Sequence, residues 1–237
     1  MQLSVPIFRL KRQARLLARD REIPLSAALN QIAESEGFRS WSQLSSAASH
    51  HRPASGLLSH LNPGDLVLLG ARPGHGKTVL GLELIVEAIR RGRPGFFFTL
   101  EYNEVDVLRQ LQSLGVDPET IKRSFMLDTS DEICAEHVIA RLRQAPRGAV
   151  AAIDYLQLLD QRRRNPELAE QISALKDFAR ESASIIVVLS QIDRSFDLRG
   201  KPLPELSDVR LPNPLALSLF TKTCFMHEGE MRLEAMP

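Results

Sequence analysis

Short apolar runs alternate with amphipathic stretches through the middle of the chain. The apolar runs predict strands at residues 66–70, 95–100, 124–128, 149–154 and 184–190. The stretches between them predict helices at residues 78–91, 104–114, 131–144 and 167–182. Continuous apolar strands that alternate with helices are typical of a parallel sheet covered by helices on both faces. The pattern therefore predicts an α/β fold with a mostly parallel sheet.

The first 50 residues have a purely helical pattern. Apolar residues recur on one face over residues 8–21, Ser26 is expected to cap a second helix, and a third short helix carries Trp41. Basic residues outnumber acidic ones here, which leaves two readings open: a docking or nucleic-acid-binding module, or the solvated face of amphipathic helices. The predicted organisation is a small helical domain at 1–50, a linker at 51–60 and the α/β domain at 61–237.

Beyond residue 190 the alternation loosens. Residues 193–214 contain four prolines and predict a long loop, and long loops in compact domains are usually functional. A final pair of strands is expected at 215–226 and 231–236, joined by a turn at Glu228 and Gly229.

A glycine-rich turn joins the first predicted strand to the first helix of the α/β domain. This strand–loop–helix order is the context of a phosphate-binding P-loop, with Lys77 reaching the β- and γ-phosphates and Thr78 holding Mg²⁺. Ala71 stands where the P-loop pattern has its first glycine, which is tolerable if its φ is negative. The alternative is a plain strand–turn–helix. The predicted nucleotide-binding residues are Ala71, Arg72, Pro73, Gly74, His75, Gly76, Lys77, Thr78 and Val79.

Three polar residues follow other predicted strands, at the sheet edge where ligands of such folds bind. Asp154 is expected to support Mg²⁺, or else to cap a strand end. Glu101, on a strand expected beside the P-loop strand, is expected to act as the base toward water; its alternative is a favourable charge at a helix N-terminus. Gln191 is either a γ-phosphate sensor or an ordinary polar residue.

Basic residues gather in the two loops that follow the Asp154 and Gln191 strands. They are candidate contacts to nucleic-acid phosphates, with a solvated charge run as the alternative. The candidates are Arg162, Arg163, Arg164, Arg194, Arg199 and Lys201.

Five strings, in order, resemble motifs of the DnaB-type replicative helicases. They are ARPGHGKT at 71–78, FFTLE at 97–101, IDYLQLL at 153–159, LSQIDR at 189–194 and SDVR at 207–210. The resemblance implies a RecA-like P-loop ATPase core, with ATP and Mg²⁺ as cofactors and Glu101 as catalytic base. It also implies a homo-oligomer, usually a hexameric ring, with single-stranded DNA in its pore. The family's arginine finger is not recognisable after Arg210, and Lys222, Arg232 and the arginines of the two basic loops are candidate substitutes.

Composition adds little to this picture. The formal net charge is +1, 43% of residues are hydrophobic, and no run reaches the ~18 apolar residues of a membrane span. The separated Cys134 and Cys224 are expected to be reduced thiols of a cytoplasmic protein. The sequence thus predicts an ATP-hydrolysing DnaB-like DNA helicase or translocase core. The alternative is a slow, nucleotide-dependent regulatory or docking ATPase of RecA-like type without helicase activity.

Overall fold

The computed structural model describes residue 4 and residues 7–44, 53–156, 159, 165–211 and 215–236. The chain divides into two compact units. One consists of Met1–Pro53 with Glu228–Glu230, and the other of Ala54–His227 with Met231–Pro237. Within the described residues, no helix is both long enough and apolar enough to span a bilayer.

The N-terminal unit is helical, as predicted. Its described helices are α1 (Ile7–Asp20), α2 (Leu25–Ser35) and a further turn of helix at 41–44. Leu10, Ala33, Phe38 and Leu44 form a small buried cluster, with Trp41 partly buried against it. The expected cap at Ser26 is wrong, because α2 begins at Leu25 with Pro24 in the N-cap position.

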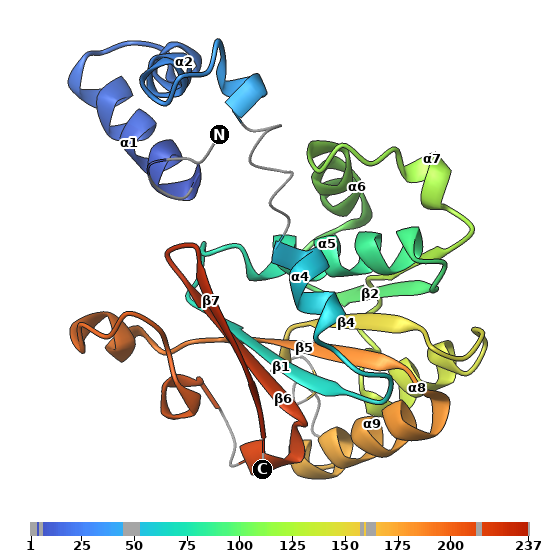
Figure 1. Ribbon diagram of the computed structural model, residues 1–237. Coiled ribbons are helices and arrows are strands. Elements are labelled where there is room, and N and C mark those ends of the chain that lie inside the picture. The colour runs from blue at the N-terminus through green and yellow to red at the C-terminus, as the bar shows by residue number, and fades with distance from the viewer. Residues whose placement is uncertain are drawn as a thin grey trace. The chain divides into compact units, whose positions relative to one another are not determined.

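A seven-stranded sheet forms the centre of the larger unit (Figure 1). Its strand order is β3-β2-β4-β5-β1-β6-β7, and every pairing among β1 to β6 is parallel. The strands are β1 (Leu66–Ala71), β2 (Gly95–Thr99), β3 (Phe125–Asp128), β4 (Val150–Asp154), β5 (Ile185–Gln191), β6 (Lys222–His227) and β7 (Glu230–Ala235). The helices are α4 (Pro53–Ser59), α5 (Lys77–Arg90), α6 (Glu104–Ser113), α7 (Pro118–Ile121), α8 (Ala135–Leu142) and α9 (Leu168–Ser182), with 3-10 turns η2 (Arg194–Leu198), η3 (Leu206–Asp208) and η4 (Leu217–Leu219).

Both faces of the sheet are covered, which confirms the predicted fold class. Alternate residues of β1 point to opposite faces, so Leu66 and Leu68 join one core cluster while Val67 and Leu69 join the other. The first cluster includes apolar residues of α8 and α9, and the second includes those of α4, α5 and α6. Burial on both faces explains why these strands consist almost wholly of apolar residues.

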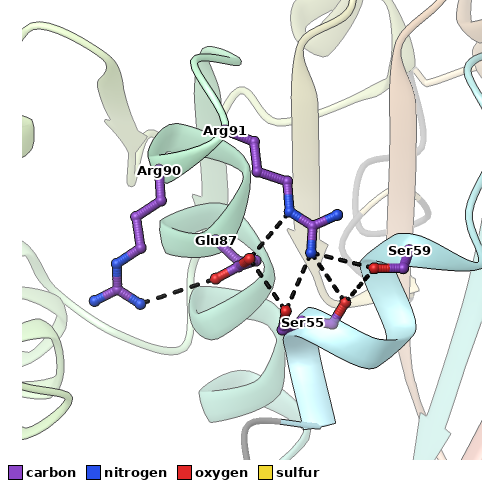
Figure 2. A network of polar contacts seen from close by, with 5 residues as sticks. All are labelled: Ser55, Ser59, Glu87, Arg90 and Arg91. Carbon is purple, nitrogen blue, oxygen red and sulfur yellow. Dashed lines mark hydrogen bonds and ion pairs between the residues drawn. The ribbon is translucent and has the colours of Figure 1, made fainter.

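Helix α4 occupies most of the segment where a linker was expected. Its Ala54, Leu57 and Leu58 are buried in the core cluster that α5 shares. At the C-terminal end of α5, Arg91 Nη2 donates to the Ser55 carbonyl and to the hydroxyls of Ser55 and Ser59, at 3.1–3.2 Å (Figure 2). Glu87 accepts from Ser55 and Arg91 beside them. Residues 53–59 of the predicted linker therefore form a helix that packs on the larger unit, and the boundary between the two units falls at Pro53 and Ala54, inside the predicted segment. Residues 51–52 lie outside the described residues.

Two other predicted elements are shorter than expected. The helix predicted at 131–144 begins only at Ala135, whose backbone N–H donates to the buried side chain of Gln171 at 3.0 Å. The strand predicted at 215–226 is confined to β6, because residues 217–219 form η4. The turn into β7 lies where the sequence placed it, with Glu228 and Gly229 both at positive φ, as a tight hairpin turn requires.

Candidate functional site

The loop between β1 and α5 has the backbone of a phosphate cradle. Gly74 and Gly76 adopt φ values of 80° and 87°, which only glycine adopts at no steric cost. Gly76 is the N-cap of α5, so the first backbone N–H groups of this helix face the loop. Ala71 ends β1 and is fully buried, and it is not among the described residues with positive φ. The condition for Ala in place of the first glycine is thus met.

Four side chains meet above the carboxyl ends of the strands. Lys77 Nζ lies 2.6 Å from Asp154 Oδ1 and 3.1 Å from Glu101 Oε2. Thr78 Oγ1 donates to the other oxygen of Asp154 at 2.7 Å. The exposed fractions of the Lys77 and Asp154 side chains are 7% and 0%, against 31% for Glu101. The Lys77–Asp154 pair is therefore shielded, while Glu101 is reachable from solvent.

Burial and mutual attraction compete within this cluster. Burial disfavours the charged form of Lys77, yet the carboxylates of Asp154 and Glu101 outweigh it and raise the pKa of the ammonium. Burial also raises the pKa of Asp154, against the opposing contacts from Lys77 and Thr78. The Asp154 carboxyl thus lies beside one cation, Lys77, in a buried site where water does little to stabilise its charged form.

Gln191 completes the cluster at its outer side. Its Nε2 donates to Glu101 Oε1 at 3.4 Å, so each Glu101 oxygen has a partner. Tyr155, which follows Asp154 directly, places its ring centroid 5.2 Å from Lys77 Nζ. Nothing in the sequence singled out Tyr155 for this contact, because it stood only within the string at 153–159 that resembles a DnaB-type motif.

The strand order corrects one expectation about Glu101. Its strand β2 is not beside β1, because β4 and β5 lie between them. Adjacent β2 and β4 place Thr99 opposite Asp154, so Glu101 just beyond Thr99 lies near Asp154, and Lys77 Nζ contacts both acids. Lys77 reaches both because α5 leaves β1 and packs over β4 and β2.

Arg72 and His75 of the loop make contacts that the sequence did not suggest. Arg72 forms two hydrogen bonds to Asp197 in η2, at 3.0 and 2.8 Å. The His75 ring stacks on His227 of β6, with centroids 4.8 Å apart, and Phe196 meets His227 edge-on at 4.9 Å. No local pattern connects these residues, which are far apart in the chain.

The basic candidates for nucleic-acid contact have varied surroundings. Arg162, Arg163 and Arg164 lie outside the described residues. Arg199 Nη1 is ion-paired with the buried Asp208 at 2.8 Å, and Lys201 with Glu205 at 2.9 Å. Arg194 is exposed at the start of η2. The structure therefore brings Arg194, Arg199 and Lys201 into one loop, but engages two of them in internal ion pairs.

The oxygen donors at the P-loop fit a magnesium ion held jointly with phosphate. Mg²⁺ is usually bound by one or two protein oxygens together with substrate phosphates and water. The Thr78 hydroxyl and the Asp154 carboxylate, 2.7 Å apart, supply such a set. Within the described residues, no group of three or more His, Cys, Asp or Glu side chains forms an all-protein metal cage.

The parallel sheet, the glycine-rich loop and the Lys–Thr–Asp cluster together define a RecA-like P-loop fold. Comparison with known proteins agrees. The family model described as "DnaB-like helicase C terminal domain" matches residues 118–213. The chain is 30% identical over 184 residues to replicative DNA helicase DnaB of Helicobacter pylori, covering 64% of this chain and 38% of that protein. The DnaB of Leifsonia xyli is 28% identical over 185 residues, covering 65% and 40%.

Solved structures show the same fold at lower identity. One solved ATPase domain has a TM-score of 0.57 at 21% identity, covering 69% of each chain. A DnaB-like replicative helicase has a TM-score of 0.57 at 22% identity, covering 69% of this chain and 48% of that chain. A KaiC-like protein of Pyrococcus horikoshii has a TM-score of 0.52 at 20% identity, covering 68% and 70%.

These comparisons confirm the resemblance to DnaB-type replicative helicases and the RecA-like fold. The chain spans about two fifths of the length of the curated relatives it matches.

Proposed function

We propose that the chain is the ATP-binding and ATP-hydrolysing core of a DnaB-like DNA helicase. The observation that supports it most is the buried contact of Lys77 and Thr78 with the two oxygens of one carboxylate, Asp154. A plain strand–turn–helix needs no buried lysine and carboxylate, which are costly to desolvate. The similarity to replicative helicases extends this from nucleotide binding to work on DNA.

Each side chain has a distinct role in the proposed reaction. When bound, ATP and Mg²⁺ supply a γ-phosphoryl group open to in-line attack by water. Lys77 and the backbone of residues 71–79 would hold the phosphates, and Thr78 and Asp154 would hold the metal. The Glu101 carboxylate orients the attacking water and accepts its proton, because it is the partly exposed acid of the cluster. Gln191, bonded to Glu101, senses the γ-phosphate and passes the change to the loop that follows β5.

The same proposal includes the DNA and the neighbouring subunits that the ATPase core would contact. Single-stranded DNA binds the loops after β4 and β5, through Arg162, Arg163, Arg164, Arg194, Arg199 and Lys201. The proposed working form is a homo-oligomer, specifically a hexameric ring. It is proposed to act on DNA in the cytoplasm. Lys222 and Arg232 are candidates for a finger into a neighbouring subunit. Lys222 is engaged at 2.8 Å with Asp65 in a largely buried pair, whereas the pair of Arg232 with Glu234, at 3.1 Å, is exposed, which favours Arg232.

The test is the ATPase rate of the full chain with and without single-stranded DNA. We expect DNA to stimulate the wild-type rate and Lys77→Ala to abolish nucleotide binding. Glu101→Gln is expected to lower kcat by at least about a hundredfold with little change in nucleotide affinity. Glu104→Gln is the matched control, because Glu104 is an exposed acid at the start of α6. An unchanged rate in Glu101→Gln would contradict the base assignment, and a monomer with no DNA binding would contradict the helicase.

A further inference from the structure

A hollow lies at the edge of the sheet where the parallel strands begin, opposite to the edge that carries the P-loop. It has a volume of about 820 Å³ and is formed where β2, β3 and β4 begin. Gly95 and Phe125 are the first residues of β2 and β3, and Gly148 precedes β4. Because all these strands are parallel, their first residues lie at one edge and the ATP-site residues at the other. The hollow is therefore separate from the proposed ATPase site.

The lining of this hollow is basic. Arg93, Lys122, Arg123 and Arg147 contribute to it, and none of its lining residues is acidic. Lys122 has an exposed partner, Glu119, at 3.3 Å. In the loop after β5, by contrast, cations are matched to buried or nearby acids. A hollow that concentrates positive charge in this way attracts anions.

Arg93 is the anchored member of the group. Its Nε donates to the Gly148 carbonyl at 2.5 Å, which orients the guanidinium. Its Nη2 is buried and has no hydrogen-bond partner among the residues that the structure describes. Burial, and then the charge of Arg91, lower the pKa of Arg93, so the cation lacks compensation. Arg93 is thus a positive charge held beside the hollow, and an anion in the hollow would offset that charge.

The rest of the lining is largely apolar. Phe96 is buried, Phe125 and Met126 are half-buried, and Pro94 and Pro146 also contribute to the wall. Small-ligand sites typically measure ~300–1,000 Å³ and combine an apolar lining with a few convergent polar groups. The hollow meets both descriptions.

We propose that this hollow binds the phosphate group of a small phosphorylated ligand, with Arg93 as the oriented member of its cationic lining. A guanidinium matches phosphate oxygens in a two-point geometry, and a doubly charged phosphate satisfies more than one of the surrounding cations. The group is either free phosphate or a phosphate ester such as a nucleoside monophosphate, whose base would pack on Phe125. The proposal is independent of the ATPase assignment.

The test is calorimetric titration of the full chain with inorganic phosphate and, separately, with a nucleoside monophosphate. We expect Arg93→Ala to weaken binding at least about tenfold and Arg147→Ala, at an exposed position, about threefold. Arg109→Ala, an exposed arginine of α6 outside the hollow, is the matched control and should bind like wild type. The titrations are also made in a Lys77→Ala background, in which the P-loop no longer holds phosphate, and there the hollow should still bind both probes and Arg93→Ala should still weaken that binding.

Several outcomes would overturn the proposal. They are no binding of either probe at millimolar concentration, equal binding by wild type and Arg93→Ala, or loss of binding in Lys77→Ala. Displacement of the probe by a single-stranded oligonucleotide would instead assign the edge to nucleic acid. If Arg93→Ala does not fold, Arg93→Lys keeps the charge but loses the two-point geometry, and it should still bind at least several-fold more weakly. Tighter binding of the nucleoside monophosphate identifies a phosphate ester, and equal binding identifies free phosphate.

Discussion

Arg72 in the P-loop and Asp197 in η2 form a two-point ion pair across 125 residues of sequence. Nε and Oδ1 are 3.0 Å apart, and Nη2 and Oδ2 are 2.8 Å apart. Arg72 Nη1 also donates to the Ile192 carbonyl at 3.0 Å. The hydrogen bonds from Arg72 are the main reason that the pKa of Asp197 is lowered. The loop after β5 is thereby tied directly to the loop that is proposed to hold phosphate.

Replacing Asp197 should loosen both of these loops. The Asp197 side chain is 51% exposed, so the pair is expected to contribute at most about 1 kcal/mol. Asp197→Ala should therefore speed amide hydrogen exchange in residues 193–199 and 72–76 by about two- to fivefold, with little change in overall stability. Lys201→Ala, which removes an exposed pair in the same loop, is the control and should leave residues 72–76 unchanged. Faster exchange in η2 alone would show that the two loops are not coupled.

Tyr155 is expected to position the ammonium of Lys77. A lysine over an aromatic ring gains about 0.5–2 kcal/mol, the larger value when it is desolvated as Lys77 is. Tyr155→Leu should weaken nucleotide binding by between about two- and thirtyfold, whereas Tyr155→Phe should bind like wild type. Fluorescent-nucleotide titration of both variants measures this. Equal weakening in both would assign the effect to the tyrosine hydroxyl rather than to the ring.

Asp128, at the end of β3, should make stability depend on pH. Burial alone would raise the pKa of its carboxyl, but His137 at 2.8 Å and the hydrogen bonds from Ser130 lower it. A carboxyl whose pKa is lower in the folded state stabilises the protein above its unfolded pKa, about 3.9, and loses this effect as pH falls through the folded value.

Asp128→Asn should therefore cost about 1.5–3 kcal/mol at pH 7, and the gap to wild type should narrow as pH falls below about 4. Urea unfolding of both proteins at several pH values measures the gap. Asp106→Asn, at an exposed and distant ion pair, is the control and should show no such trend. A gap that stays constant down to pH 3 would contradict the assignment.

The two cysteines should differ sharply in reactivity. Both are free thiols, but Cys224 of β6 is fully buried and its burial raises the pKa to about 12, whereas Cys134 is partly exposed at the start of α8. Because the thiolate is the reactive form, a disulfide reagent at pH 8 should modify one thiol rapidly in the native chain and the second only after denaturation. Cys134→Ser should remove the rapid phase. A rapid phase that survives in Cys134→Ser would show that Cys224 reacts in the native chain, because β6 separates from β1.

Local chemistry made much of the proposed site predictable. A glycine-rich turn between an apolar strand and an amphipathic helix identified Lys77 and Thr78, and polar residues at the ends of apolar strands identified Glu101, Asp154 and Gln191. The structure places all five together. The contacts of Arg72 with Asp197 and of His75 with His227 had no such signal, because each depends on how distant segments pack.

The linker prediction shows the limit of composition. Residues 51–60 are rich in Ser, Ala, Pro and Gly, yet their few apolar side chains, Ala54, Leu57 and Leu58, find a buried surface on α5. A short segment with weak periodicity becomes a helix when a neighbouring element covers its apolar face.

The sequence by itself determined the class of fold, the glycine-rich loop that is proposed to hold phosphate and the side chains at the strand ends, because hydrophobic period and turn chemistry act over a few residues. Only the tertiary structure decided the strand order, in which β4 and β5 separate Glu101's strand from β1, and the parallel addition of β6 beside β1. It also decided which loops touch and where a basic hollow forms at the opposite edge of the sheet. Those features depend on burial shared between segments far apart in the chain, which no local pattern records.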